Sequence, residues 1–251
     1  MATVVVVGAG MGGMAAAARL SVKGHQVTVV ERSATPGGKL ASYSRDGFVF
    51  DTGPSLLTLP AVYRDLFSMT GRAELEQCVD LQPVEPAFSY TWADGARAVL
   101  PGSGTGAVAA ALGDALGGTA AEDWKGLMRH GGEVWRLTRR PVLEAPLAGP
   151  RDLLPLLRRP SDLGKVAPWR SLRGLGRSRL RDPRMVTLLD RYATYTGSDP
   201  RRAPSALVTV PYVEQTFGAW HLGGGLANLA VALADRLSQR HVDLRLNTEV
   251  E

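Results

Sequence analysis

Four residues near the start of the chain have the types and the spacing that bind a dinucleotide. Gly8, Gly10 and Gly13 form a G-x-G-x-x-G pattern, and Glu31 follows at the distance typical of a ribose-binding acid. The first glycine permits a tight turn, the second lets the backbone approach a pyrophosphate, and the third lets a helix pack on a strand. N–H groups at the start of that helix can bind phosphate oxygens, and the carboxylate can accept hydrogen bonds from two ribose hydroxyls. The sequence therefore predicts a site for an adenine dinucleotide.

The residues around this pattern predict the strand–helix–strand unit that must position it. Residues 3–7 (TVVVV) have the β-branched composition of a buried parallel strand, and residues 14–20 follow as a helix that ends near Gly24. Residues 26–30 (QVTVV) form a second strand, which Glu31 closes. The alternative is a glycine-rich turn in an unrelated α/β domain, but the strand, helix, second strand and terminal acid all fall at the expected spacing.

A second glycine pair, Gly37 and Gly38, follows Glu31 and Arg32 and precedes Lys39. Binding of NAD does not require such a pair. It resembles the extended motif of the two-dinucleotide-binding-domain flavoproteins, where the pair lies beside the diphosphate of FAD. That resemblance implies FAD as the cofactor. The family usually has arginine where this chain has Lys39; lysine keeps the charge but loses the bidentate geometry.

Residues 48–55 (FVFDTGPS) contain Asp-Thr-Gly-Pro, which by itself is a favourable turn sequence. Behind the two glycine motifs, the segment resembles the phytoene-desaturase-like oxidoreductases, the carotenoid and retinoid branch of these flavoproteins, where it approaches the flavin end of the cofactor. The same family has a Pro-Tyr-Val-Glu stretch followed by an aromatic-x-x-Gly-Gly-x-x-x-Leu element, and residues 211–214 and 220–226 resemble these two elements. Trp220 and His221 stand where tyrosine and proline are usual.

The glycine pattern and the resemblance together imply a set of cofactor contacts. The last of them is the backbone of a valine that would contact adenine where the chain returns to the dinucleotide sheet. The set is Gly8, Gly10, Met11, Gly12, Gly13, Glu31, Arg32, Gly38, Lys39, Gly53, Pro54, Ser55 and Val250. No catalytic residue is assigned, since no paired carboxylates or triad are visible; no metal is expected, and His221 is assigned no role.

The composition is that of a globular protein, with 45% hydrophobic and 21% charged residues among 251. Cys78 is the only cysteine, which excludes an internal disulfide and suits a reducing cytosol. Residues 4–18 are apolar but glycine-rich, too short to span a membrane, and lack the preceding basic stretch of a secretory signal.

Strands over residues 79–84, 87–92 and 96–100, followed by a helix over 107–116, predict departure into a second domain. The loop Gly102–Gly106 lacks the Lys-Ser/Thr of a P-loop and is interpreted as a helix entry. The expected fold is α/β: a Rossmann-like FAD-binding domain of the two-dinucleotide-binding-domain flavoprotein type, with an inserted α+β substrate domain.

The expected domains are residues 1–80 for FAD, residues 81–240 for the substrate and membrane, and residues 241–251 as the start of the return to the FAD domain. The resemblance covers the whole chain but only about the N-terminal half of a typical family member. We therefore expect the C-terminal part of the fold to be absent here, the chain being a fragment or its complement being supplied by a later segment or a partner chain.

Residues 136–184 carry thirteen Lys/Arg against four Asp/Glu, and prolines divide them into short pieces. Leucines and a tryptophan, among them Leu153, Trp169, Leu172, Leu175 and Leu180, lie between the arginines. Such pieces can lie in an anionic membrane surface, which predicts a cytoplasmic protein peripheral to the inner face of the cell membrane. The alternative is a solvated basic face on a helical lid. No recognition motif accompanies the basic stretch, so nucleic acid is not expected as a partner. A further helix is expected over Asp182–Gly197, and a helix and strand over 226–237 and 243–246.

The resemblance implies FAD-dependent desaturation of a carotenoid such as phytoene, an apolar polyene, by hydride transfer to the flavin. A carotene isomerase or a retinol saturase would carry the same motifs. A non-redox isoprenoid-binding protein of the same fold would show a degraded glycine loop, and an amine or amino-acid oxidase would need polar substrate contacts.

Overall fold

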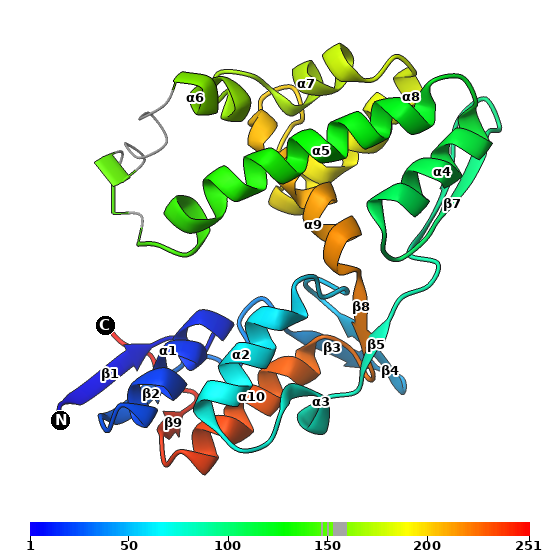
Figure 1. The fold of residues 1–251 in the computed structure, drawn as a ribbon. Coiled ribbons are helices and arrows are strands. Elements are labelled where there is room, and N and C mark those ends of the chain that lie inside the picture. The colour runs from blue at the N-terminus through cyan, green and yellow to red at the C-terminus, as the bar shows by residue number, and fades with distance from the viewer. Residues whose placement is uncertain (147, 150, 153–159) are drawn as a thin grey trace. The chain divides into compact units, whose positions relative to one another are not determined.

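The computed structural model describes residues 1–146, 148–149, 151–152 and 160–251, and divides them into two compact units (Figure 1). Unit 1 comprises Met1–Val84 and Ala219–Glu251, and unit 2 comprises Glu85–Gly218. Each unit has its own hydrophobic core. Unit 2 is therefore inserted into the sequence of unit 1.

Unit 1 is built around a three-stranded parallel sheet with the order β1-β2-β9. Its elements are β1 (Thr3–Val7), α1 (Met11–Val22), β2 (Gln26–Val30), β3 (Ser42–Arg45), β4 (Phe48–Asp51), α2 (Pro60–Thr70), α3 (Leu75–Cys78), β5 (Leu81–Pro83), β8 (Trp220–Leu222), α10 (Ala227–Gln239) and β9 (Asp243–Arg245). In register, Val5 pairs with Thr28 and Val29 with Leu244. The three sheet strands come from both ends of the chain, so the C-terminal segment adds the third strand to the two that the N-terminal segment forms.

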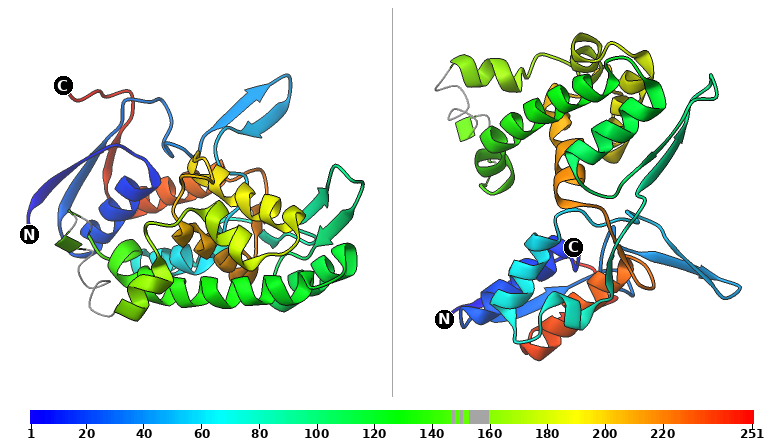
Figure 2. Two further views of the ribbon diagram at one scale, coloured as in Figure 1. Left: turned by 90° about the horizontal axis from the view of Figure 1, so that it is seen from above. Right: turned by 45° about the vertical axis from the view of Figure 1, so that its right-hand side comes forward.

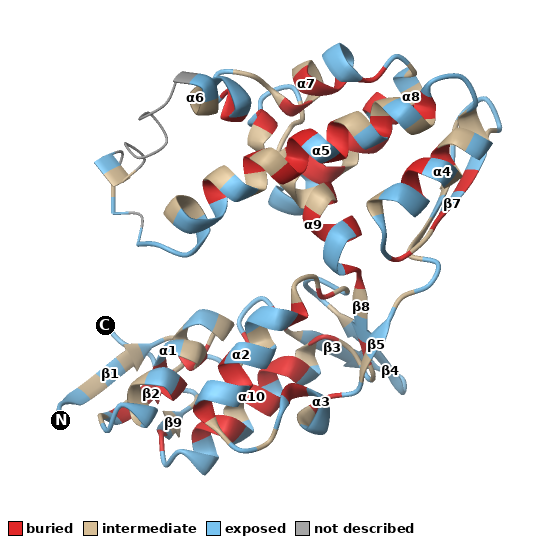
Figure 3. Cartoon of the chain, in the orientation of Figure 1, coloured by how far each residue is buried: buried red, intermediate tan, exposed pale blue. Residues whose placement is uncertain are grey.

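The core of unit 1 lies between this sheet and helices α1, α2 and α10. Helix α1 packs on β2 and against both α10 and α2 (Figure 2). Met14, Val29, Phe67, Leu229 and Leu233 are fully buried there. Figure 3 shows the buried positions of α2 and α10 in red. The i, i+4 spacing of Leu229 and Leu233 places both on one face of α10, and this buried face ties α10 to unit 1.

Two antiparallel pairs complete unit 1. The hairpin β3–β4 turns at Asp46 and Gly47, both with positive φ, as a two-residue hairpin turn requires. Strand β5 pairs with β8, so that Leu81 faces Leu222 across the pair. The division of the chain accordingly lies at Val84 and Ala219 rather than at the expected 80/81 and 240/241, since α10 packs with α1.

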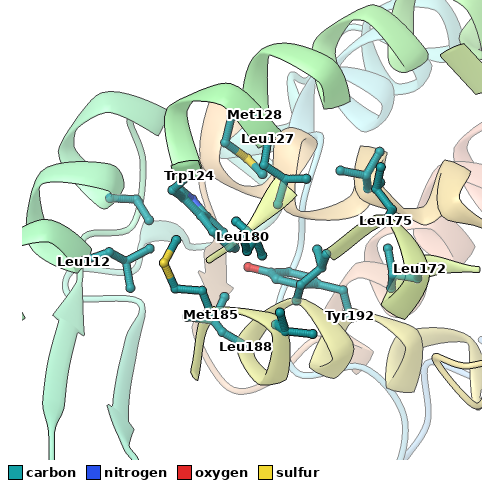
Figure 4. Close-up of a cluster of buried hydrophobic side chains, with 14 of the residues drawn as sticks. Leu112, Trp124, Leu127, Met128, Leu172, Leu175, Leu180, Met185, Leu188 and Tyr192 are labelled. Atoms are coloured by element: carbon teal, nitrogen blue, oxygen red, sulfur yellow. The ribbon is translucent and has the colours of Figure 1, made fainter. Parts of the chain in front are cut away.

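Unit 2 is mostly helical, with one hairpin. Its elements are β6 (Phe88–Thr91), β7 (Arg97–Leu100), α4 (Thr105–Leu116), α5 (Ala120–Thr138), η1 (Arg139–Leu143), α6 (Pro160–Val166), α7 (Leu172–Arg179), α8 (Pro183–Asp190), η3 (Arg191–Thr196), η4 (Ser205–Val208) and α9 (Thr209–Phe217). Helix α5 contacts α4, α6, α7 and α9, and its Trp124 and Leu127 are fully buried. Figure 4 shows these side chains facing Met185 and Tyr192 in the core of unit 2.

Several expectations for unit 2 are changed in detail. The helix expected over Asp182–Gly197 is α8 followed by the 3₁₀ segment η3, and it ends at Gly197 with φ +62°. Leu172, Leu175 and Leu180, which a membrane-bound stretch would expose, lie in the core, whereas Trp169 is 71% exposed. Leu153 and the other residues from 153 to 159 lie outside the described part of the chain.

Candidate cofactor-binding site

The glycine loop of the first motif joins β1 to α1 and leaves open space where a phosphate would approach. Gly8 has φ +97° and its N–H donates to the carbonyl of Val30 at 2.7 Å. Gly10 is the N-cap of α1, and the N–H groups of the first helical turn have no acceptor inside the helix. A Cβ at Gly10 would meet no atom within 4 Å, whereas a Cβ at Gly13 would overlap the carbonyl oxygen of Gly8. Gly13 therefore serves packing, and Gly10 keeps the loop surface free.

The carboxylate of Glu31 is held at the end of β2 by two backbone N–H groups. Oε2 accepts from Ala9 at 2.7 Å and Oε1 accepts from Ser33 at 2.9 Å. These hydrogen bonds, that of Ser33 first, lower the pKa of Glu31. The group is thus an anion at neutral pH, and its remaining lone pairs can accept hydrogen bonds from hydroxyls.

A hollow of about 260 Å³ lies beside Glu31. It is lined by Val7, Gly8, Val30, Glu31, Arg32, Thr248, Glu249 and Val250. Thr248 donates its N–H to the carbonyl of Glu31 at 2.8 Å, which holds the C-terminal segment against the end of β2. The structure thus brings Arg32 and Val250, predicted from opposite ends of the chain, to one wall of the same hollow.

The second glycine pair lies directly against the first loop. The N–H of Gly37 donates to the carbonyl of Ala9 at 2.8 Å, and Gly10 and Gly37 form a parallel bridge. A Cβ on Gly38 would lie 3.3 Å from the Cα of Gly10. Any larger residue at Gly38 would therefore crowd the open loop at Gly10, so the two motifs form one glycine-lined surface.

The third motif is pressed against the second. A Cβ on Gly53 would overlap the carbonyl oxygen of Lys39. Gly53, Pro54 and Ser55 themselves are exposed. The predicted contacts Met11, Gly12 and Lys39 lie in the described structure with these segments, so the fold gathers all the sequence-predicted residues on unit 1. Their contact with a cofactor stays a prediction.

Sequence reasoning missed one residue at this surface. The carboxylate of Asp51, which ends β4, accepts from the N–H groups of Leu226 at 2.9 Å and Ala227 at 3.3 Å. These residues follow the Gly-Gly element, 175 positions along the chain. The sequence signal is the Asp of the Phe-Asp-x-Gly-Pro segment, which the resemblance places near the flavin end without assigning this aspartate a role.

The structure also places the loop Gly102–Gly106 and His221. The N–H of Gly102 donates to Glu85 at 2.7 Å and that of Gly104 to the carbonyl of Gln215 at 2.7 Å, and Gly104 is the N-cap of α4, so this loop is a helix entry. His221 lies exposed on β8 opposite Gln82.

Glu214, from the Pro-Tyr-Val-Glu stretch, is buried in unit 2. It accepts hydrogen bonds from the hydroxyls of Tyr192 and Tyr195, each at 2.7 Å. The guanidinium of Arg191 lies 3.5 Å away and 4.3 Å from the ring centre of Phe88. Among the described residues, the donors to this carboxylate are Arg191, Tyr192 and Tyr195, all in unit 2, so Glu214 helps to hold that unit together.

Comparison with known proteins places the chain in a family. The model of the flavin-containing amine oxidoreductases matches residues 11–251. A phytoene desaturase (neurosporene-forming) of Cereibacter sphaeroides is 32% identical over 250 residues, which cover 98% of this chain and 46% of that protein. A 4,4'-diapolycopene oxygenase of a Methylomonas species is 30% identical over 247 residues, covering 98% and 49%. The chain therefore spans about half the length of the curated relatives it matches.

The fold agrees with this match. A solved structure of a putrescine oxidase triple mutant superimposes with a TM-score of 0.62 at 20% identity, over all of this chain and 52% of that one. The expected α/β fold is thereby confirmed, and the flavin of the matching family confirms the expected cofactor, FAD. By its match over residues 11–251, nearly the whole sequence, the chain belongs to the flavin-containing amine oxidoreductase family.

Proposed function

We propose that this chain is the nucleotide-binding part of an FAD-dependent oxidoreductase that dehydrogenates a carotenoid such as phytoene. The observation that carries the proposal is the single surface formed by the glycine loop, the second glycine pair and Glu31 on unit 1. The relatives that match nearly all of the chain include a phytoene desaturase and a diapolycopene oxygenase, which supports an apolar polyene as substrate.

The residues present fit the cofactor. Glu31, an anion with free lone pairs, would accept from the ribose hydroxyls, beside Arg32 and the backbone of Val250 at the adenine end. The backbone of Gly10–Gly13, with Gly38 and Lys39, would face the diphosphate, because the open space at Gly10 and the start of α1 lie there. The exposed turn Gly53–Ser55 would meet the flavin end. FAD, when bound, would supply the hydride acceptor: one carbon of a saturated CH–CH unit would lose a hydride to it and the neighbouring carbon a proton, so that a double bond forms between them.

We further propose a contact between unit 2 and an anionic membrane surface on the cytoplasmic side. Trp169 is 71% exposed and is followed by Arg170, which supports an interfacial anchor at this point. The buried Leu172, Leu175 and Leu180 belong to the core and not to such an anchor. Among the described helices, none combines the length and apolar character needed to traverse a bilayer.

The remaining part of the family fold would come from a further segment or a partner chain. The relatives are about twice as long as the matched region, which supports this proposal. Val5 and Val7 lie on β1, the edge strand of the sheet, and are 61% and 68% exposed. This exposure supports a further segment that packs against β1.

The experiment has a binding part and a product part. FAD is titrated into the purified chain, and into Gly10→Val and Glu31→Ala variants, with flavin fluorescence as readout; both variants are expected to bind more weakly. Phytoene in liposomes is then supplied to the chain combined with the proposed further segment or partner chain, and the product mass is measured. Loss of hydrogen supports a desaturase, whereas unchanged mass indicates an isomerase and a gain of hydrogen a saturase. Undiminished FAD binding by both variants would refute the site.

A further inference from the structure

The turn Thr52–Ser55, which the proposed function assigns to the flavin end of FAD, is exposed along its length but attached at both ends. On its far side, Leu57 and Trp220 exchange two backbone hydrogen bonds, at 2.8 and 2.9 Å. On its near side, Thr52 donates its N–H and its hydroxyl to the carbonyl of Ala41, at 2.9 and 3.0 Å. The conformation of the turn is therefore set by its anchors rather than by burial of its own side chains.

The anchor with a charge is Asp51, immediately before the turn. Its Oδ2 accepts from the N–H of Leu226 at 2.9 Å and its Oδ1 from that of Ala227 at 3.3 Å. These amides open helix α10, where the helix dipole and the unpaired N–H groups favour a negative charge. Leu226 is buried, so water does not readily replace the carboxylate there.

The loop before α10 is shaped to admit this carboxylate. Gly225 has φ +100°, and a Cβ there would lie 2.9 Å from Oδ1 of Asp51. The next two N–H groups, those of Asn228 and Leu229, donate to the carbonyls of Gly225 and Leu226. Asp51 therefore satisfies the two amides at the start of α10 that the helix itself does not, and the glycine gives it room.

We propose that Asp51 is a positioning residue for the flavin end of the cofactor. By binding the start of α10 it fixes where the turn Gly53–Ser55 lies relative to Lys39 and the two glycine motifs. In this role its carboxylate acts through the turn, by way of its hydrogen bonds to Leu226 and Ala227. This inference rests on the proposed function, and it predicts that loss of the carboxylate disturbs the flavin end of the site and spares the adenine end, which depends on Glu31.

The test compares Asp51→Asn with Asp46→Asn, a matched control at the exposed tip of the same hairpin, where asparagine readily adopts the positive φ of 52°. Each protein is titrated with FAD and with ADP, and the visible circular dichroism of the bound isoalloxazine is recorded. Because a charge-assisted bond to a buried amide is lost, FAD affinity is expected to fall about tenfold in Asp51→Asn. ADP affinity is expected to stay unchanged, and the isoalloxazine band to weaken.

Equal FAD affinity in Asp51→Asn and wild type would overturn the inference. An equal loss of FAD and ADP affinity would also overturn it, because Asp51 would then support the whole unit. Asp51→Ser, a short uncharged acceptor, gives the same comparison if Asp51→Asn does not fold. A wild-type chain that binds neither nucleotide would instead refute the proposed function, so the two failures are distinct.

Discussion

Alanine at Gly10 and alanine at Gly13 are expected to have opposite effects, although the two glycines share one loop. At Gly10, φ is −70° and ψ is 168°, which alanine adopts without strain, and the added Cβ meets no atom within 4 Å. At Gly13, the Cβ would overlap the carbonyl oxygen of Gly8 and lie 3.4 Å from a methyl group of Val6. Gly10→Ala fills the space where the nucleotide is proposed to bind, and Gly13→Ala separates α1 from β1.

The magnitudes follow from these contacts. In Gly13→Ala the helix must move away from Gly8 to avoid the overlap, which should lower the free energy of unfolding by about 1–3 kcal/mol. The melting temperature should fall by about 4 °C for each kcal/mol in a unit of this size. Gly10→Ala should leave stability unchanged or raise it by about 0.4–1 kcal/mol, since the unfolded chain loses freedom. Its methyl group would meet the pyrophosphate, so ADP affinity should fall at least about tenfold.

The assay pairs thermal unfolding, followed by circular dichroism, with calorimetric titration of ADP. Gly10→Ala should unfold like wild type and bind poorly, and Gly13→Ala should unfold earlier. Wild-type ADP affinity in Gly10→Ala would show that the pyrophosphate does not pass this loop. An unchanged melting temperature in Gly13→Ala would show that the helix does not depend on its close approach to Gly8.

Three further predictions concern buried or hydrogen-bonded charges. Arg236, 1% exposed, donates to the carbonyls of Phe67 and Ala73, so Arg236→Met should lower the unfolding free energy by about 3 kcal/mol in urea denaturation; an unchanged midpoint would contradict this. Glu214→Gln leaves Arg191 without its counter-charge and should cost about 2–4 kcal/mol, measured in the same way, and a loss no larger than that of an exposed-site variant would count against it. The pKa of Glu31 is lowered in the folded state, so its carboxylate stabilises the protein above the unfolded value of about 4.3. The stability gap between wild type and Glu31→Gln should therefore be full at neutral pH and close as pH falls through the lowered pKa; a gap independent of pH would refute the assignment.

Local patterns in the sequence predicted the first strand–helix–strand unit well. The strands at residues 3–7 and 26–30 have the bounds expected, because β-branched residues favour the extended conformation of a buried strand. Helix α1 begins at Met11, earlier than the expected residue 14, since its first turn consists of glycines that helix propensity disfavours. Tertiary packing of Gly13 on Gly8 overrides that propensity.

Contacts between distant segments could not be predicted. Nothing near Asp51 indicates that its partners are the amides of Leu226 and Ala227, because that pairing arises only when β4 and α10 fold together. The hairpin β3–β4 was missed although Asp46-Gly47 is a strong hairpin-turn signal. The leucines at 172, 175 and 180 were placed at a membrane because short amphipathic helices have the same pattern in a bilayer surface as in a small helical core.

The pairing of β5 with β8 has a consequence for how this architecture can change. The chain leaves unit 1 after Val84 and re-enters at Ala219, and the N–H of Val84 donates to the carbonyl of Ala219 at 2.9 Å. Exit and entry are therefore neighbours, the geometry in which a whole domain can be grafted in or excised while its host stays intact. A two- or three-residue link from Val84 to Ala219 would turn these strands into an ordinary hairpin. The same junction would allow different domains to be inserted into unit 1.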